Sequence, residues 1–160
     1  MKIDIIQADY QNSHHQQDIP FLLNEYAKDP MGGNSALDTE VYSNLVSHLA
    51  KLPHAFTVLA YVDGKPAGLA NCFEGFSTFA CKPLVNIHDM GVIASYRGMG
   101  LSQKLLEKVE EIANGKGCCK ITLEVLTCNH VAKAAYQKFG FSDYELDPSA
   151  GSAVFWQKKL

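Results

Sequence analysis

The 160-residue sequence lacks the features that mark membrane-spanning, secreted and nucleic-acid-binding proteins. No apolar run approaches the ~20 residues that a helix needs to span a bilayer. The first ten residues, MKIDIIQADY, are too short and too acidic for a signal peptide. The 14 basic residues are outnumbered by 17 acidic ones, so the net charge of −3 argues against a basic face for nucleic acid. We therefore expect a cytoplasmic protein with no membrane and no nucleic-acid partner.

The spacing of the cysteines shows no redox or metal-binding pattern. The five cysteines are an odd number and include no C-x-x-C pair: Cys72, Cys81, Cys118, Cys119 and Cys128. The histidines likewise show no metal-ligand spacing with cysteine or aspartate. This usage argues against a disulfide framework and against a zinc site. We expect reduced thiols buried as small hydrophobic groups, and no bound metal.

The sequence does contain apolar residues at regular spacing, and this spacing alternates along the chain between the one typical of strands and the one typical of helices. After an opening strand at 2–8, a helix is expected at 18–27, capped by Asp18 with Pro20 in its first turn, and a second from residue 38 or 39. Asp63-Gly64 is the strongest hairpin signal. The other expected elements are strands at 56–62, 66–73 and 84–93, a helix at 100–113, a strand at 121–126, a helix at 129–139, and strands at 141–146 and 153–157. This order predicts a mixed α/β fold in a single domain, residues 1–160.

The most informative stretch is residues 86–106, NIHDMGVIASYRGMGLSQKLL, which reads as a strand, a glycine turn and a helix start. Gly98 and Gly100 remove side chains where backbone N–H groups can surround an anion, and the helix dipole points to the same place. A dinucleotide-binding loop fits poorly because Gln103 occupies the third glycine position. A nucleotide-hydrolysing loop would need Gly-Lys-Ser/Thr, which is missing. A tight connection without any ligand remains the plain alternative.

Two motifs in this order resemble the GNAT family of N-acetyltransferases. Arg97-x-x-Gly100-x-Ser102 is close to that family's [QR]-x-x-G-x-[GA] pattern, from which Ser102 departs. Downstream, the string from Asn129 to Phe141 is similar to N-x2-A-x3-Y-x-K-x-GF at every stated position. The stretch around His88 also resembles the diamine (spermidine/spermine) acetyltransferase branch, which carries Glu-Asp where this chain has His88-Asp89.

The resemblance implies a GNAT fold, with a mixed central sheet of six to seven strands, four helices and a splayed strand that binds acetyl-CoA. It also implies acetyl-CoA as co-substrate, a small-molecule amine as acceptor, and a homodimer. The backbone N–H of Met90 or Val92 is then a candidate donor to the acetyl oxygen. The residues implied for the coenzyme are Met90, Gly91, Val92, Arg97, Gly98, Met99, Gly100, Leu101, Ser102, Asn129 and Tyr136.

Acetyl transfer to an amine needs a base that accepts the proton of the amine and a hydrogen-bond donor that stabilises the oxyanion forming on the acetyl group. It also needs a proton donor for the leaving thiolate. Tyr136 lies two helical turns beyond Asn129 on the same face, and the resemblance makes its phenol the proton donor. A core tyrosine is the alternative. Because side chains alternate along a strand, His88 is expected on the same face as Met90 and Val92, and its imidazole is the candidate base. A structural histidine is the alternative.

The acceptor pocket is expected to hold a cationic amine. Asp89 is predicted to face away from His88 unless a bulge intervenes, and either attracts the amine or orients the strand. Tyr26 and Asp29 add an aromatic ring and an acid from the first helix and the loop after it, although such residues are equally typical of a solvated face. The substrate residues are thus His88, Asp89, Tyr26 and Asp29. The alternatives are a non-catalytic acyl-CoA sensor and an enzyme that acetylates protein or peptide amines.

Overall fold

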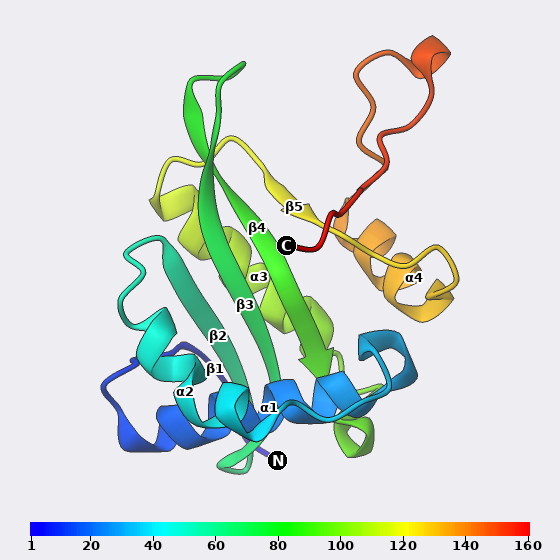
Figure 1. Ribbon diagram of the computed structural model, residues 1–160. Helices are drawn as coiled ribbons and strands as arrows, with labels where there is room; N and C mark the ends of the chain where they lie inside the picture. The colour runs from blue at the N-terminus through cyan, green and yellow to red at the C-terminus, as the bar shows by residue number, and fades with distance from the viewer. The chain divides into compact units, whose positions relative to one another are not determined.

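A mixed five-stranded sheet forms the centre of the first 123 residues (Figure 1). This computed structural model describes all 160 residues, in two compact units, Met1–Leu123 and Glu124–Leu160. In sheet order the strands are β1 (Ile3–Gln7), β2 (Ala55–Val62), β3 (Lys65–Ser77), β4 (Lys82–Val92) and β5 (Ile121–Leu123). Neighbours in β1–β4 pair antiparallel, and β5 joins β4 in parallel. The predicted α/β class is confirmed, but with five strands rather than six to seven.

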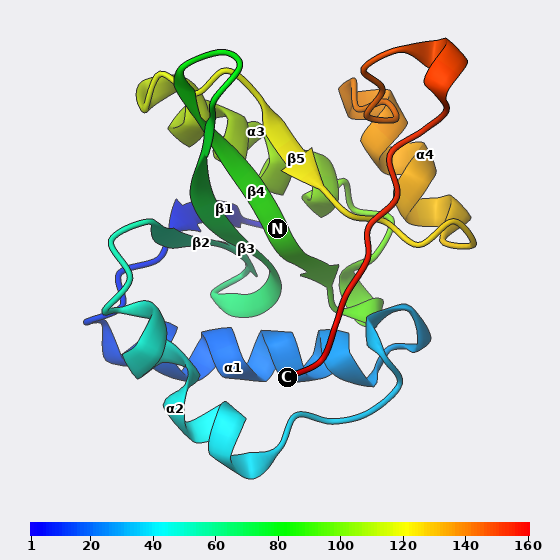
Figure 2. The same cartoon turned by 45° about the horizontal axis from the view of Figure 1, so that its top comes forward.

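Helices cover both faces of this sheet (Figure 2). On one face, α1 (Ser13–Lys28) and α2 (Thr39–Leu49) pack on β2 and β3; α3 (Leu101–Gly115) packs on the other. The first face buries Ile19, Leu22, Val46, Leu49, Leu59 and Leu69 in one cluster. Two short 3-10 helices, η1 (Pro30–Gly32) and η2 (Ala94–Tyr96), follow α1 and β4. The face covered by α1 and α2 is called the α1–α2 face below.

The β2–β3 hairpin forms where the sequence predicted it. Asp63 and Gly64 have φ of 49° and 77°, the left-handed pair that a two-residue hairpin turn requires. Asp63 also accepts a hydrogen bond from the Lys2 backbone at 2.7 Å, which ties the turn to the start of the chain. The turn therefore sets the pairing of Val62 with Lys65 and of Tyr61 with Pro66, and a β-bulge next to Tyr61 then shifts the register of β2 against β3 by one residue.

The first helix begins earlier than predicted. Its N-cap is Asn12, whose side chain accepts from the N–H groups of His14 and His15, and the helix starts at Ser13. Asp18 lies inside the helix and accepts a hydrogen bond from the Tyr61 hydroxyl at 2.7 Å. The predicted cap at Asp18 is wrong because that carboxylate serves a contact with β2. None of the helices has the length and apolar character needed to cross a membrane.

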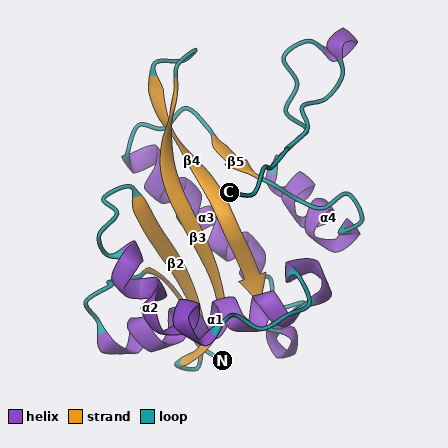
Figure 3. Ribbon diagram, viewed as in Figure 1, coloured by secondary structure: helices purple, strands orange, loops and turns teal.

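The second unit, Glu124–Leu160, contains α4 (His130–Phe139) and the 3-10 helix η3 (Pro148–Ala150), but no strand (Figure 3). The predicted strands at 141–146 and 153–157 are therefore wrong. One backbone hydrogen bond joins these segments, from the Ala153 N–H to the Tyr144 carbonyl at 3.4 Å. A strand needs a ladder of such bonds, and alternation along the sequence cannot show whether a partner edge exists.

Candidate functional site

Strand β4 has an open edge over its last five residues. Its parallel pairing with β5 covers only Val85–Ile87, while pairing with β3 continues to Val92. The Ile93 N–H donates to the Ala67 carbonyl at 2.9 Å, toward β3. Because peptide groups alternate along a strand, those of Met90 and Val92 point away from β3. These peptide groups can therefore hydrogen-bond an extended molecule laid along the edge.

A β-bulge at His88 changes which side chains share a face of β4. Asp89 pairs with Asn71 and Ile87 with Cys72, so His88 is an extra residue without an opposite partner. The His88 and Phe73 rings are packed edge to face, with their centroids 5.7 Å apart. Phe73 in turn packs against the buried hydrophobic cluster on the α1–α2 face. Asp89 bonds to Asn71, two residues from Leu69 of that cluster. His88 and Asp89 thus lie together on the α1–α2 face.

The prediction that His88 shares a face of β4 with Met90 and Val92 is therefore wrong. Val92 packs with Ala67 and Leu101 on the α3 side, and Met90 shares that side by alternation. The extra residue at the bulge shifts the period by one, which separates His88 from Met90 and Val92. Two consecutive polar residues inside an apolar strand were the only sequence sign of this shift.

Tyr26 closes over the same face from α1. A Cβ on Gly91 would lie 3.0 Å from the Tyr26 ring, so only glycine lets the ring approach β4 this closely. Tyr26 is half-buried, and burial, then the negative charges of Asp89 and Asp29, raise the pKa of its phenol. Three predicted substrate residues, Tyr26, His88 and Asp89, are thus brought together.

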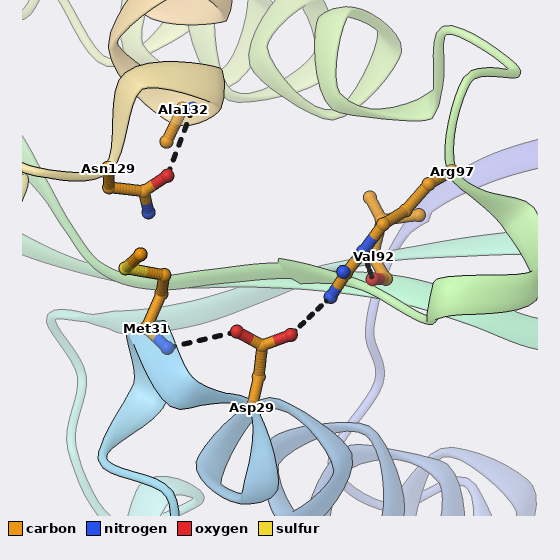
Figure 4. A network of polar contacts seen from close by, with 6 residues as sticks. All are labelled: Asp29, Met31, Val92, Arg97, Asn129 and Ala132. Atoms are coloured by element: carbon orange, nitrogen blue, oxygen red, sulfur yellow. Dashed lines mark hydrogen bonds and ion pairs between the residues drawn. The ribbon is translucent and has the colours of Figure 1, made fainter.

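Asp29 and Arg97 pair with each other across 68 residues of sequence (Figure 4). The Arg97 guanidinium bonds Asp29 at 2.6 Å, and its Nε donates to the Val92 carbonyl at 3.2 Å. Asp29 also caps η1 by accepting from the Met31 N–H at 3.0 Å. The hydrogen bond from Arg97, then that from Met31, lowers the pKa of Asp29. The pair joins the end of α1 to the turn that precedes α3.

This pair predicts a pH-dependent contribution to stability. The stabilisation is present above the unfolded Asp value of ~3.9 and is lost as the pH falls through the lowered folded pKa. Arg97 is 56% exposed, so solvent screens the pair. We expect Asp29→Asn, which keeps an oxygen for Met31, to lower the free energy of unfolding at pH 7 by about 0.5–1 kcal/mol.

Urea unfolding across pH tests this, with Arg97→Gln as the matched variant. The difference between wild type and Asp29→Asn should shrink as the pH falls through the lowered pKa of folded Asp29, and the two substitutions should not add. A constant difference at every pH would show that the charge of Asp29 contributes nothing.

The glycine turn before α3 has the backbone that the sequence suggested. Gly98 and Gly100 have φ of 81° and 75°, where a side chain would be strained. Gly100 is the N-cap of α3 and brings no side chain to the first turn. The helix start therefore keeps backbone donors available to an anion.

The predicted coenzyme residues Asn129 and Tyr136 lie in the second unit. The Asn129 side chain caps α4 by accepting from the Ala132 N–H at 3.2 Å (Figure 4). The Tyr136 ring meets the Phe141 ring edge-on at 6.0 Å, where the chain turns back after Gly140 at φ 114°. Their roles toward a coenzyme remain proposals.

A buried chain of polar groups, which the sequence analysis missed, reaches Asp89. Asn71 donates to Asp89 Oδ2 at 3.1 Å and accepts from Thr57 Oγ1 at 2.8 Å. Thr57 Oγ1 lies 2.9 Å from the Tyr10 hydroxyl. Thr57 and Asn71 are the polar residues buried in the core. Their sequence sign was a polar residue inside each of two apolar strands.

The cysteines differ from the prediction, because only Cys72 is buried. Burial, then the charge of Asp89, raises the pKa of the Cys72 thiol, so a reactive thiolate is disfavoured there. Cys118 is half-buried, and Cys81, Cys119 and Cys128 are exposed and free. No group of three or more His, Cys, Asp or Glu side chains is arranged to hold a metal.

Comparison with known proteins identifies the family. Residues 19–141 match the acetyltransferase (GNAT) family, and the chain belongs to it. A mouse protein named thialysine N-epsilon-acetyltransferase is 39% identical over 59 residues, which are 37% of this chain and 35% of that protein. The chain thus spans about a third of the length of this relative.

Two further similarities extend over more of the chain. A Bacillus subtilis protein named putative [ribosomal protein bS18]-alanine N-acetyltransferase is 25% identical over 114 residues, 68% of this chain and 72% of that protein. The structure of the aminoglycoside N-acetyltransferase AAC(6')-Iy in complex with CoA superposes with a TM-score of 0.74 at 19% identity, covering 99% and 96% of the chains. The latter supports the fold.

Proposed function

We propose that this protein transfers an acetyl group from acetyl-CoA directly to a primary amine of a small molecule. The observation that carries the proposal is the bulge in β4, which puts His88 and Asp89 on one face beside its open edge. Family membership supplies the reaction class. Relatives named for thialysine and for aminoglycosides favour small cationic amines.

The open edge and the glycine turn fit the two ends of a coenzyme A molecule. Its amide-containing arm can pair with the peptide groups of Met90 and Val92 as an added strand would. Its phosphates suit the N–H groups from Gly98 to Ser102 at the start of α3. Gly91, Met99 and Leu101 complete these backbone segments, and Asn129 is assigned to the amides of the arm. Acetyl-CoA supplies the activated acetyl group.

Arg97 was expected to contact the coenzyme, but we propose a structural role for it instead. Its guanidinium is already bonded to Asp29 and to the Val92 carbonyl. We therefore assign the phosphates to the backbone of the turn, and we assign Arg97 to holding that turn against α1. Asp29 likewise serves as its partner, which leaves Asp89 as the acid for the acceptor amine.

We assign each step of the transfer to an individual group of the chain. Asp89 attracts the cationic amine and Tyr26 forms a wall beside it. His88 accepts a proton from the amine, which frees the nitrogen lone pair to attack the acetyl carbonyl. The N–H of Met90 or Val92 donates to the acetyl oxygen as negative charge develops there. The Tyr136 hydroxyl gives a proton to the departing sulfur.

Thiol release in the presence of acetyl-CoA and a panel of amines tests the proposal. The panel contains thialysine, spermidine, an aminoglycoside and a peptide with a free N-terminal alanine. We expect turnover on a small cationic amine and none without amine. Turnover on the peptide alone favours a protein acetyltransferase, in line with the bacterial relative. Tight acetyl-CoA binding with no turnover on any amine favours an acyl-CoA sensor.

A further inference from the structure

We propose that Thr57 and Asn71 are positioning residues that hold the carboxylate of Asp89 toward the acceptor amine. The inference rests on the proposed function and adds to it a control of acceptor binding from within the core. Thr57, Asn71 and Asp89 stand directly opposite one another on β2, β3 and β4. They form one row across the sheet on the α1–α2 face.

The charge of Asp89 fixes the direction of every hydrogen bond in this row. An ionised carboxylate only accepts, so Asn71 must present its NH₂ to Asp89 and its oxygen to Thr57. Thr57 gives its single hydroxyl hydrogen to that oxygen, so the Tyr10 hydroxyl must donate to Thr57. All donors therefore point toward Asp89. The row holds Oδ2 and leaves Oδ1 to meet a cation.

Packing alone does not account for these side chains. Thr57 is fully buried and Asn71 is 3% exposed, whereas Leu59 and Leu69 lie on the same two strands two residues away. Apolar residues of similar shape would fill the row without the cost of desolvating polar groups. A fully satisfied polar chain in such a place is instead suited to fixing one orientation of the group at its end.

A matched pair of variants at Thr57 separates a role in positioning Asp89 from a role in packing the core. Thr57→Val keeps the shape and removes the hydroxyl, whereas Thr57→Ser keeps the hydroxyl. With the amine that the wild type acetylates, Thr57→Val should raise the KM for amine about fivefold. The KM for acetyl-CoA should stay constant, and Thr57→Ser should behave as wild type. In an Asp89→Asn background, Thr57→Val should have no further effect on the amine KM.

A second measurement needs no activity. Urea midpoints of Thr57→Val, Asp89→Asn and the double variant should be non-additive, because Asn71 couples two residues that do not touch. Tyr10→Phe, at the half-buried end of the row, replaces Thr57→Val if that variant does not fold. Equal amine KM values for Thr57→Val and Thr57→Ser, or additive midpoints, would overturn the inference. Failure of the wild type with every amine would instead overturn the proposed function.

Discussion

Replacing Tyr136 with phenylalanine is expected to lower kcat about 10²-fold while the KM for acetyl-CoA changes less than about twofold. The phenol donates its proton only as the carbon–sulfur bond breaks, so its loss affects the transition state and not coenzyme binding. The ring itself remains, and with it the edge-on contact with Phe141 that packs the end of α4. Initial rates with varied acetyl-CoA give both constants.

Tyr144→Phe is the matched control for this experiment, since it removes a phenol from the same unit outside α4. Its rates should equal those of the wild type. If Tyr136→Phe also keeps the wild-type kcat, the hydroxyl has no part in proton transfer and Tyr136 is a packing residue.

Replacing His88 with alanine is expected to lower kcat/KM near neutral pH about 10²-fold and to remove the ascending limb of its pH profile. A base must lose its own proton before it can accept one from the amine, and this loss produces the ascending limb. The bulge exposes the His88 ring on the α1–α2 face, where it can reach an acceptor.

His54→Ala provides the control for the His88 variant. The His54 ring lies 6.0 Å from the same Phe73 ring that His88 contacts, so both variants remove an imidazole from one aromatic neighbour. Only His88→Ala should lose the ascending limb. Its retention in His88→Ala would place the base elsewhere and leave His88 a structural role beside Phe73.

Local chemistry explains why much of the fold was predictable. The Asp63-Gly64 turn, the apolar face of α3 and the glycine that ends α4 each depend on neighbours a few residues away. The candidate coenzyme turn follows the same logic, because Gly98 and Gly100 mark positive φ directly. The family assignment, which rests on two such local motifs, is confirmed.

The features that escaped prediction depend on residues far apart in sequence. The bulge at His88 is defined by its pairing with β3, and the Arg97–Asp29 pair spans 68 residues. Asp18 lost its predicted cap role to Tyr61, a residue on another strand. The single domain over residues 1–160, the homodimer and the cytoplasmic location remain predictions.

We expect the acetyl group to pass directly from acetyl-CoA to an amine at the α1–α2 face, beside His88 and Asp89. Mass spectrometry with isotope-labelled acetyl-CoA tests this transfer, because it follows the label in both the protein and the amine. We predict labelled amine with the wild type, much less with His88→Ala, and no label on the protein when amine is left out. A stable acetyl group on a cysteine would show that transfer passes through the protein, and coenzyme binding without any labelled amine would show that no acetyl transfer takes place.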